Sequence, residues 1–485
     1  MSALLAVAPQ LGIIAMVMSL SHLLPIGVSI AHGDGTADAF AFSMAFNCAT
    51  GYVVWVLTHR YRRDLSPRDG ILLVALAWTG GAAFATLPLL MAIPGLSFTD
   101  AYFETMSGLT TTGSTVLSSL DALAPALNIW RGLLVWLGGM GLIVLAVAIL
   151  PLLGVGGRQI FKAETPGPMK DAKLTPRITE TAKGLWVVYA LISLACVVAY
   201  RLAGMTWFDA FMHMFSTMGL GGFSSHDASF GYWNSPLIES VAIFFMLAAG
   251  INFGTHFLAL RGRSALPYRR DPEAGLFVLI TLASCVGVAL YLLAMNVYAD
   301  FWTALRFASF NVVSIATTTG FTNTDYNAWP VFAPMWMLFL CCFVSCSGST
   351  GGGIKLIRAQ ILYLQLHREF VKLLHPDAVT PLKLGGQVIE NKIVFAVLAF
   401  LFIYLCCVVA MTLLLLASGL DAVTGFSAVI ASINNTGPGL NQVGPATTYE
   451  VLSDFQTWVC TFAMLIGRLE LFTVLVIFTP VFWRK

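Results

Sequence analysis

The sequence TTTGST at residues 110–115 is followed along the chain by three similar stretches, LGGFSS at residues 220–225, TTTGFT at residues 317–322 and NNTGPG at residues 434–439. Aligned on Gly113, Gly222, Gly320 and Gly437, these stretches lie 109, 98 and 117 residues apart. Each follows a short apolar segment and precedes a longer one. The recurrence predicts four copies of one helix–loop–helix hairpin within a single chain.

The composition is that of an integral membrane protein. Hydrophobic residues make up 58% of the 485 residues and charged residues only 10%, whereas soluble domains carry about 25% charged residues. The first apolar run, residues 4–30, has no basic segment before it and is long enough to cross a bilayer, which favours a retained helix over a cleaved signal. The nine cysteines form no CxxC pair, so we expect them to pack in the interior.

The apolar segments define the predicted topology, since about 20 apolar residues are needed to cross a bilayer. Shorter apolar stretches, at residues 99–109, 208–218, 303–316 and 422–433, each stand just before a glycine loop. The sequence therefore predicts an all-α polytopic membrane protein with two leading helices and four helix–pore-loop–helix repeats around a central pore. Full-length spans are expected at about residues 4–30, 39–58, 70–93, 127–153, 184–203, 236–260, 275–299, 331–363, 392–418 and 455–482. The predicted units are residues 1–68 for the leading pair and 69–157, 184–262, 273–375 and 390–485 for the repeats.

The placement of basic residues orients this topology. Arginine and lysine cluster after the second, fourth, sixth and eighth spans and at the end of the chain, and these points share one side of the membrane if every span crosses once. The positive-inside rule makes that side the cytoplasm. Both termini are then cytoplasmic and the glycine loops open outward. The clusters are Arg60, Arg62, Arg63 and Arg68; Arg158, Lys162, Lys170, Lys173, Arg177 and Lys183; Arg261, Arg263, Arg269 and Arg270; Arg368, Lys372 and Lys383; and Arg484 and Lys485.

The four loops have the composition of a cation pathway. Backbone carbonyls in rings can replace the hydration shell of a cation, and glycine reaches backbone angles that let successive carbonyls face one axis. Short helices whose C-terminal ends point at this axis would add negative potential. A single TTTG between apolar runs is more often an ordinary external turn, but four copies in register on one predicted face favour a pore.

These motifs resemble the TrkH/KtrB superfamily of bacterial potassium uptake proteins, and the two leading helices make the chain similar to the TrkH branch. The resemblance implies that the four loops form a selectivity filter for K⁺. Sodium-preferring relatives carry serine in the first loop, so Gly113 implies potassium selectivity. The second and fourth loops depart from TTTG, which implies weaker discrimination among monovalent cations. The implied filter residues are Thr110, Thr111, Thr112, Gly113, Leu220, Gly221, Gly222, Thr318, Thr319, Gly320, Asn435, Thr436 and Gly437.

Two further features lie within predicted spans. The eighth span contains CSGSTGGG at residues 346–353, and so many glycines cannot continue a stable helix. A Walker motif is excluded because Ile354 and Lys355 follow in place of GK[ST]. The remaining alternatives are a tolerated kink and a movable segment in the permeation path. The resemblance implies the second, a gate formed by Gly348, Ser349, Thr350, Gly351, Gly352 and Gly353.

Arg468 lies in the middle of the tenth span, where a charge usually faces a cavity or an ionic partner. Glu470, two residues on, lies on a different helix face, so a direct pair with Arg468 is not expected. A salt bridge to another helix is one alternative. The resemblance implies the other, in which Arg468 acts with the gate as an electrostatic barrier below the filter.

Other polar residues are assigned structural roles. Capping or packing is expected for Glu104 and His213, and N-terminal capping of two short helices for Asp100 and Asp209. Asn252 and His256, in the sixth span, face either a cavity or a neighbouring helix.

No catalytic motif is present, so we expect a protein that is not an enzyme. The resemblance implies a K⁺ uptake pore that also passes Rb⁺, in the inner membrane, with K⁺ as its ion and no organic cofactor. It also implies a homodimer on a cytosolic nucleotide-binding ring of the TrkA type, in contact with the bilayer and with no nucleic acid. The alternatives are a K⁺ symporter coupled to H⁺ or Na⁺, which would need carboxylates within the spans, a membrane-embedded enzyme and a structural scaffold.

Overall fold

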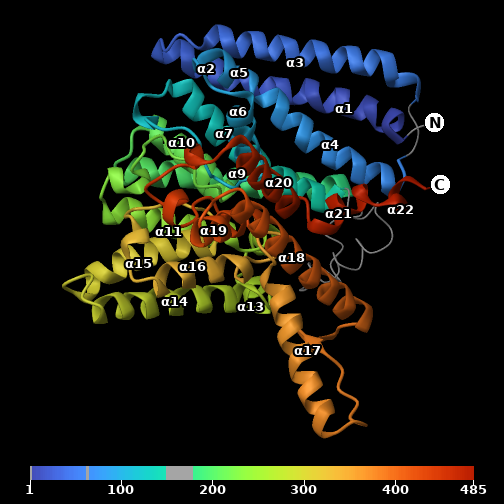
Figure 1. Ribbon diagram of the computed structural model, residues 1–485, viewed down its shortest axis with the longest axis vertical. Coiled ribbons are helices and arrows are strands. Elements are labelled where there is room, and N and C mark those ends of the chain that lie inside the picture. Colours follow the sequence, from blue (N-terminus) through green and yellow to red (C-terminus); the bar gives the residue numbers. More distant parts are fainter. Residues whose placement is uncertain (1–2, 62–64, 149–177, 485) are drawn as a thin grey trace.

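The computed structural model describes residues 3–61, 65–148 and 178–484 (Figure 1). Outside these ranges lie several of the basic residues that orient the predicted topology, namely Arg62, Arg63, Lys485 and those from Arg158 to Arg177. The end of the first predicted repeat, residues 149–157, also lies outside them.

The two leading spans form a layer at one edge of the molecule, drawn in blue in Figure 1. The first consists of α1 (Ala3–Ser19), a 3₁₀ turn (Leu20–His22) and α2 (Leu23–His32), and the second is α3 (Ala37–Thr58). α1 and α3 cross at Gly12 and Gly51, where a Cβ on either glycine would lie within 2.7 Å of the other's carbonyl oxygen. Small residues at this crossing allow the close backbone approach on which helix pairs in membranes rely.

Four groups of helices follow, and each contains a short helix that ends at a glycine loop. The first group is α4 (Pro67–Ala85), α5 (Leu87–Ala92), the short helix α6 (Phe98–Leu109) and α7 (Pro125–Ala148). The second is α9 (Ile178–Leu202), the short helix α10 (Trp207–Gly219), α11 (Pro236–Gly250) and α12 (Phe253–Gly262), followed by α13 (Leu266–Arg270).

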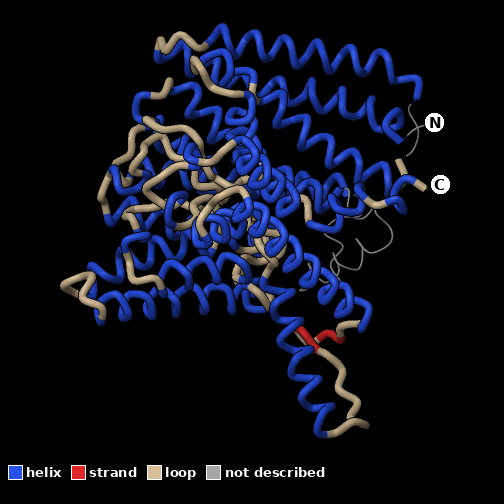
Figure 2. Tube along the Cα trace, viewed as in Figure 1, coloured by secondary structure: helices blue, strands red, loops and turns tan. Residues whose placement is uncertain are grey.

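The third group is α14 (Ala274–Ala294), the short helix α15 (Phe301–Ala316), α16 (Phe332–Phe343) and α17 (Leu356–Leu374). α17 projects from the body of the molecule, and a two-stranded antiparallel hairpin, β1 (Lys383–Leu384) and β2 (Gln387–Val388), lies in the segment that returns from its tip (Figure 2). The fourth group is α18 (Asn391–Ala417), the short helix α19 (Ala422–Ile433), α20 (Asp454–Arg468), α21 (Leu471–Leu475) and α22 (Pro480–Trp483).

Each short helix begins at a side-chain cap. Ser97, Thr206, Asp300 and Asp421 accept hydrogen bonds from backbone N–H groups in the first turns of α6, α10, α15 and α19. The predicted capping roles of Asp100 and Asp209 are therefore wrong in position, because the caps are Ser97 and Thr206. The two carboxylates lie three residues later and accept the cap hydroxyls at 2.7 Å.

Several predicted spans are broken. Within the described residues, six helices are long and apolar enough to cross a membrane, and two more spans count if bent pairs are taken together. α11 and α12 meet at 95°, and α20 meets the segment Leu471–Phe478 at 114°. The predicted eighth span is two helices, α16 and α17, separated by residues 344–355, called here the intramembrane loop. The sequence predicted this last interruption but not the other two.

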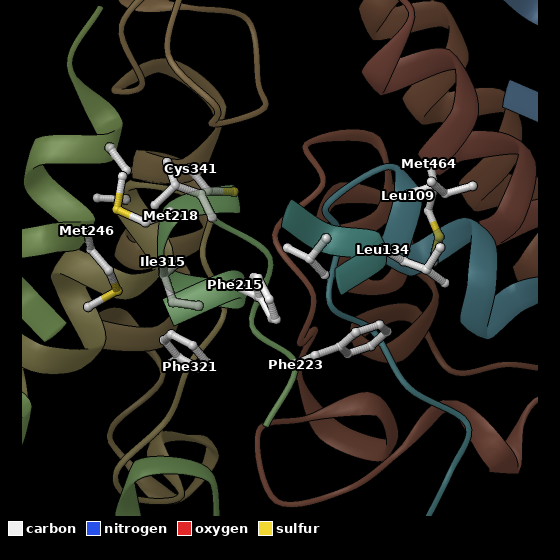
Figure 3. Packing of buried hydrophobic residues seen from close by; sticks show 14 of the residues in the cluster. Leu109, Leu134, Phe215, Met218, Phe223, Met246, Ile315, Phe321, Cys341 and Met464 are labelled. Atoms are coloured by element: carbon white, nitrogen blue, oxygen red, sulfur yellow. The ribbon is translucent and has the colours of Figure 1, made fainter. Parts of the chain in front are cut away.

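The packed interior surrounds the ends of the short helices. Figure 3 shows Leu109, Met218 and Ile315, each near the last residue of its short helix, within one buried hydrophobic cluster. In contrast, large apolar side chains on α3, α14 and α18, such as Val53, Leu279 and Phe402, are exposed. This outward apolar surface matches a molecule whose outer solvent is lipid.

Candidate ion pathway

The four glycine loops (residues 110–113, 220–222, 317–320 and 434–437) interlock in a closed ring. A Cβ on Gly113 would lie 2.8 Å from the nitrogen of Gly222, and one on Gly222 would lie 2.6 Å from Thr319 O. A Cβ on Gly320 would overlap Thr436 O, and one on Gly437 would lie 2.9 Å from Thr112 O. Each loop thus touches the next in chain order and the fourth touches the first. Only glycine fits at these contacts, which explains the recurring residue of the motif.

The backbone conformation of the loops is shared, with one exception. The residue two positions before each glycine has a positive φ: Thr111 55°, Leu220 54°, Thr318 61° and Asn435 53°. Gly113, Gly320 and Gly437 are also left-handed, with φ of 81°, 90° and 97°, whereas Gly222 is not. The sequence departure of the second loop therefore alters its backbone, while that of the fourth loop leaves the backbone like the first and third.

Most threonine hydroxyls of the glycine loops are hydrogen-bonded within the protein. Thr110 Oγ1 donates to Met106 O at 2.7 Å and lies 2.8 Å from Thr112 Oγ1. Thr317 and Thr319 repeat this pairing at 2.7 Å. These hydroxyls close the last turn of a short helix rather than serving an ion directly. The hydroxyl of Thr111 is buried and has no hydrogen-bond partner in the protein.

On one side of the ring, the residues after the glycines line an outer cavity of about 330 Å³. Its walls include Ser114, Phe223, Thr322 and Pro438, one from the segment after each glycine. Ser114 Oγ donates to Gly437 O at 2.8 Å, so the first and fourth loops are also joined by a hydrogen bond.

The outer segment after the second loop carries a titratable contact. His226 Nδ1 contacts Asp121 Oδ1, His226 Nε2 lies 3.3 Å from Asp209 Oδ1, and the imidazole stacks on Tyr232 with 3.6 Å between centroids. Burial lowers the pKa of His226, but the two carboxylates outweigh it and raise this pKa above its ordinary value. His226 thus connects the segment after the second loop to Asp121 and Asp209, and protonation of the imidazole strengthens both contacts.

On the opposite side of the ring, where the short helices end, the intramembrane loop packs against the glycine loops. Thr350 Oγ1 donates to Met218 O at 2.9 Å, and Gly352 N donates to Thr318 Oγ1 at 2.7 Å. A Cβ on Gly352 would overlap Asn434 O. The intramembrane loop thus lies directly against the second, third and fourth glycine loops or the helix ends that lead into them.

Arg468 completes this arrangement. Its guanidinium, 2% exposed, donates from Nη1 to Thr350 O at 2.7 Å and from Nη2 to Gly138 O at 3.1 Å. Gly138 on α7 packs against the carbonyl of Leu109, the last residue of α6. Arg468 therefore joins the intramembrane loop to the first group of helices. Glu470 pairs instead with Arg358 on α17, at 3.0 Å from both carboxylate oxygens.

The two ends of the intramembrane loop meet at one carboxylate. Glu273, just before α14, accepts hydrogen bonds at 3.0 Å from Ser347 N and Ile357 N, so one oxygen fastens both ends. Lys355 Nζ donates to Gly351 O across the loop. A second cavity, about 40 Å³ and lined by Gly351, Arg468 and Glu470 among others, lies beside the loop.

Most residues that the sequence singled out meet in one place, since the glycine loops, residues 348–353 and Arg468 form a continuous contact network. Asn252 caps α12 through Gly254 N at 2.8 Å, and its amide lies against Gly348 of the intramembrane loop, where an added Cβ would be 2.9 Å from Asn252 Oδ1. His256 bonds Tyr268 and Ala248, away from the glycine loops.

Three charged residues near the network were missed or misjudged. Glu104, expected to cap or pack, pairs with Arg131 at 2.7 Å, and neither Arg131 nor Glu273 was singled out. Arg131 could have been found from the sequence, because it is a charged residue inside the predicted span at residues 127–153. Among the described residues, no group of histidine, cysteine, aspartate and glutamate has the arrangement of a metal site.

The fold and this geometry define a class: a polytopic helical membrane protein in which four re-entrant hairpins surround one axis and a loop from the third group packs against them. The TrkH family, described as cation transport proteins, matches residues 36–485. The Trk system potassium uptake proteins TrkH of Salmonella typhimurium and Halomonas elongata are 44% and 45% identical to the chain, each covering 98–99% of both sequences. The crystal structure of the potassium transporter TrkH from Vibrio parahaemolyticus, 42% identical, superposes with a TM-score of 0.91 over the full length of both chains. The chain belongs to the TrkH family of cation transport proteins.

Proposed function

We propose that this chain forms a gated pore that takes up K⁺, and also passes Rb⁺, across the bacterial inner membrane, with both termini in the cytoplasm. The observation that carries the proposal is the closed ring of four glycine loops, in which each glycine packs against the backbone of the next loop. The names of the relatives, potassium uptake proteins and a potassium transporter, support K⁺ as the ion.

In this proposal the glycine loops are the selectivity filter. The short helices end at the ring, so the negative ends of four helix dipoles converge on it. Backbone carbonyls of residues 110–113, 220–222, 318–320 and 435–436 would take the place of water around the cation. Gly437 O accepts the hydroxyls of Ser114 and Tyr449, so Gly437 contributes to the filter by its packing in the ring. The unpartnered hydroxyl of Thr111 is a further candidate oxygen.

The intramembrane loop with Arg468 is the proposed gate, here in its closed state. Residues 348–353 lie across the inner side of the ring, and Arg468 brings a positive charge into the same place. A buried guanidinium on the path repels a dehydrated cation strongly, since interactions between charges are little screened there. Opening requires the loop to leave the ring and Arg468 to lose its contact with Thr350.

The proposed organisation is the leading unit, residues 1–68, with four pore repeats at 69–157, 184–262, 273–375 and 390–485. We further propose a homodimer in the bilayer whose gate is driven by a cytosolic nucleotide-binding ring of the TrkA type. K⁺ is the transported ion, and no organic cofactor is required.

Uptake of radioactive Rb⁺ into proteoliposomes tests the proposal. Wild-type protein should pass Rb⁺ down its electrochemical gradient with no imposed H⁺ or Na⁺ gradient. Gly113→Ser should admit more Na⁺, and deletion of residues 351–353 should raise the flux. Uptake that requires an imposed H⁺ or Na⁺ gradient would replace the channel with a coupled symporter.

A further inference from the structure

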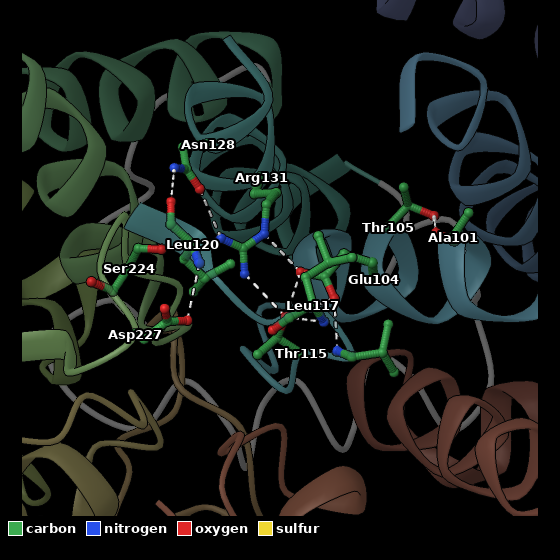
Figure 4. Close-up of polar contacts among 11 residues, drawn as sticks. Ala101, Glu104, Thr105, Thr115, Leu117, Leu120, Asn128, Arg131, Ser224 and Asp227 are labelled. Atoms are coloured by element: carbon green, nitrogen blue, oxygen red, sulfur yellow. Dashed lines mark hydrogen bonds and ion pairs between the residues drawn. The ribbon is translucent and has the colours of Figure 1, made fainter. Parts of the chain in front are cut away.

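A buried ion pair lies behind the first glycine loop, outside the ring itself. Glu104 on the short helix α6 and Arg131 on α7 are each 1% exposed, and Arg131 Nε donates to Glu104 Oε1 at 2.7 Å (Figure 4). A buried pair of this kind is retained only when its remaining donors and acceptors are satisfied, because both charges have been taken out of water. The partners of these two side chains therefore show what the pair holds.

Glu104 fastens the chain that leaves the first glycine loop. Its carboxylate accepts Val116 N at 3.1 Å and Thr115 Oγ1 at 3.0 Å. Thr115 Oγ1 in turn accepts Leu117 N at 3.0 Å and a donor from Arg131 at 3.2 Å. The backbone two to four residues after Gly113 is thus fixed to the helix that precedes it.

Arg131 reaches the second glycine loop as well. Its Nη1 donates to Ser224 O at 3.1 Å, two residues after Gly222, and to Asn128 Oδ1 at 3.1 Å. The guanidinium carbon lies 4.3 Å from the centre of the Phe223 ring. One planar side chain therefore binds the segments that follow Gly113 and Gly222, and Arg131 also borders the outer cavity.

The position of Glu104, nine residues before its glycine, differs among the four groups. The corresponding residues are Glu104, His213, Asn311 and Ala428. His213 Nε2 lies 2.9 Å from Ser224 Oγ, and Asn311 Nδ2 lies 2.6 Å from Asn323 Oδ1, so both also reach the segment after their glycine. The charged residue occurs in the first group, and its arginine partner carries the contact across to the second.

We propose that Glu104 and Arg131 are a positioning pair that sets the spacing of the first and second glycine loops and thereby the preference of the pore for K⁺ and Rb⁺ over Na⁺. This inference rests on the proposed filter role of the glycine loops. The pair is neutral as a whole, so it fixes the loops without placing net positive charge at the outer mouth. Without Glu104, the segment after Gly113 loses the acceptor of Val116 N, and the charge of Arg131 beside the entrance is no longer balanced.

The test compares Glu104→Gln and Arg131→Lys with a matched control, Glu239→Gln. Glu239 pairs with Arg306 at 2.7 Å between α11 and α15, and neither residue belongs to a glycine loop. Arg131→Lys keeps the charge pair but loses the planar fork that spans to Ser224 O, so it tests positioning if Glu104→Gln does not fold. Two quantities are measured on each variant: the ratio of initial Rb⁺ to Na⁺ uptake, and the difference between the melting temperatures in K⁺ and in Na⁺.

We expect Glu104→Gln to lower the ratio of Rb⁺ to Na⁺ uptake at least fivefold and Arg131→Lys to lower it severalfold. In both variants the melting temperature should rise less in K⁺, relative to Na⁺, than it does in the wild type. Glu239→Gln should lower the melting temperature in both salts alike and keep the ratio. An unchanged ratio and an unchanged K⁺-specific rise in folded Arg131→Lys would overturn the inference. The melting experiment does not depend on transport, so the two proposals can fail separately. Absence of passive Rb⁺ uptake by the wild type would contradict the proposed channel function. A K⁺-specific rise in melting temperature that the variants lose would still support the positioning role of Glu104 and Arg131.

Discussion

The ring of glycine loops and the intramembrane loop beside it both depend on glycine, but their polar contacts differ. In the ring, Gly113, Gly320 and their equivalents meet backbone of the next loop, and the contacts repeat in four similar segments. The intramembrane loop is a single segment, and charged side chains hold it: Arg468, Lys355 and Glu273.

This difference separates a rigid element from one that can switch. Steric contacts between backbones leave the ring a narrow range of positions, because interiors are close-packed and deform little. Contacts through charged side chains can be exchanged for water or for other partners when the loop moves. Substitutions in the two regions should therefore act in opposite directions, decreasing flux in the ring and increasing it in the intramembrane loop.

The largest effect is expected in the ring, from Gly320→Ala. The added Cβ would overlap Thr436 O, and the φ of 90° is unfavourable for alanine. Overpacking costs about 1–3 kcal/mol and the left-handed backbone about 1 kcal/mol more. We expect Rb⁺ uptake to fall at least about tenfold, which corresponds to 1.4 kcal/mol. Gly419→Ala is the control, since Gly419 has a φ of 100° but nothing within 4 Å of its Cβ position. Equal losses in both variants would mean that backbone strain, rather than the packed ring, is responsible.

The next effect is expected at Arg468. Arg468→Gln removes the donors to Thr350 O and Gly138 O, and hydrogen bonds to charged groups contribute about 1.5–3 kcal/mol each. The closed loop should lose stability and passive Rb⁺ flux should rise about tenfold. Arg201→Gln is the control, because Arg201 also donates to a carbonyl, Met205 O at 3.2 Å, but away from the ring. Reduced flux in Arg468→Gln with normal folding would contradict a gating role.

A smaller increase is expected at Glu273. Glu273→Ala leaves Ser347 N and Ile357 N without their acceptor, and an unpaired buried donor costs about 1–3 kcal/mol. Part of this is recovered when the loop moves and water reaches the N–H groups, so we expect flux to rise severalfold. Glu273→Gln retains an acceptor oxygen at the same place and should stay close to wild type. A large increase in Glu273→Gln as well would show that the charge, and not the hydrogen bonds, fastens the loop.

The features that follow from local composition were predictable, and those that depend on distant residues were not. The sequence predicted the four hairpins, the short helices and the interruption near residues 346–353, since each depends on local composition. The breaks after Gly250 and Arg468 were missed because the two helices at each break together have the length and hydropathy of one span. Polar residues stand beside both breaks, Asn252 at the first and Arg468 at the second, but hydropathy alone continues through them.

The charged contacts depend on residues far apart in the chain. Arg131 and Ser224 are 93 positions apart, and Glu273 and Ser347 are 74 apart. Such partners become visible only in three dimensions. Glu104 was assigned to capping or packing for this reason, as its position on a short helix fits either role until Arg131 is placed beside it.

The smallest effect is expected outside the ring, at His226. Because Asp121 and Asp209 raise its pKa in the folded protein, their contacts stabilise the fold fully below the ordinary histidine pKa and are lost as the pH rises through the raised value. His213, Tyr232 and Trp233 are the other polar or aromatic groups beside this imidazole. The melting temperature of the wild-type protein should therefore decline as the pH of the buffer is raised from about 6 to about 9.

His226→Gln should remove this dependence and lower the melting temperature mainly at the acidic end. His32, the last residue of α2, contacts Val28 O and the ring of Phe208 rather than a pair of carboxylates, so His32→Gln is the control. Measuring Rb⁺ uptake by the wild type and by His226→Gln at the acidic and the alkaline pH tests whether this segment also affects the glycine-loop ring. If alkaline pH lowers uptake in the wild type but not in His226→Gln, the outer segment supports the second glycine loop. An unchanged uptake would confine the role of His226 to stability.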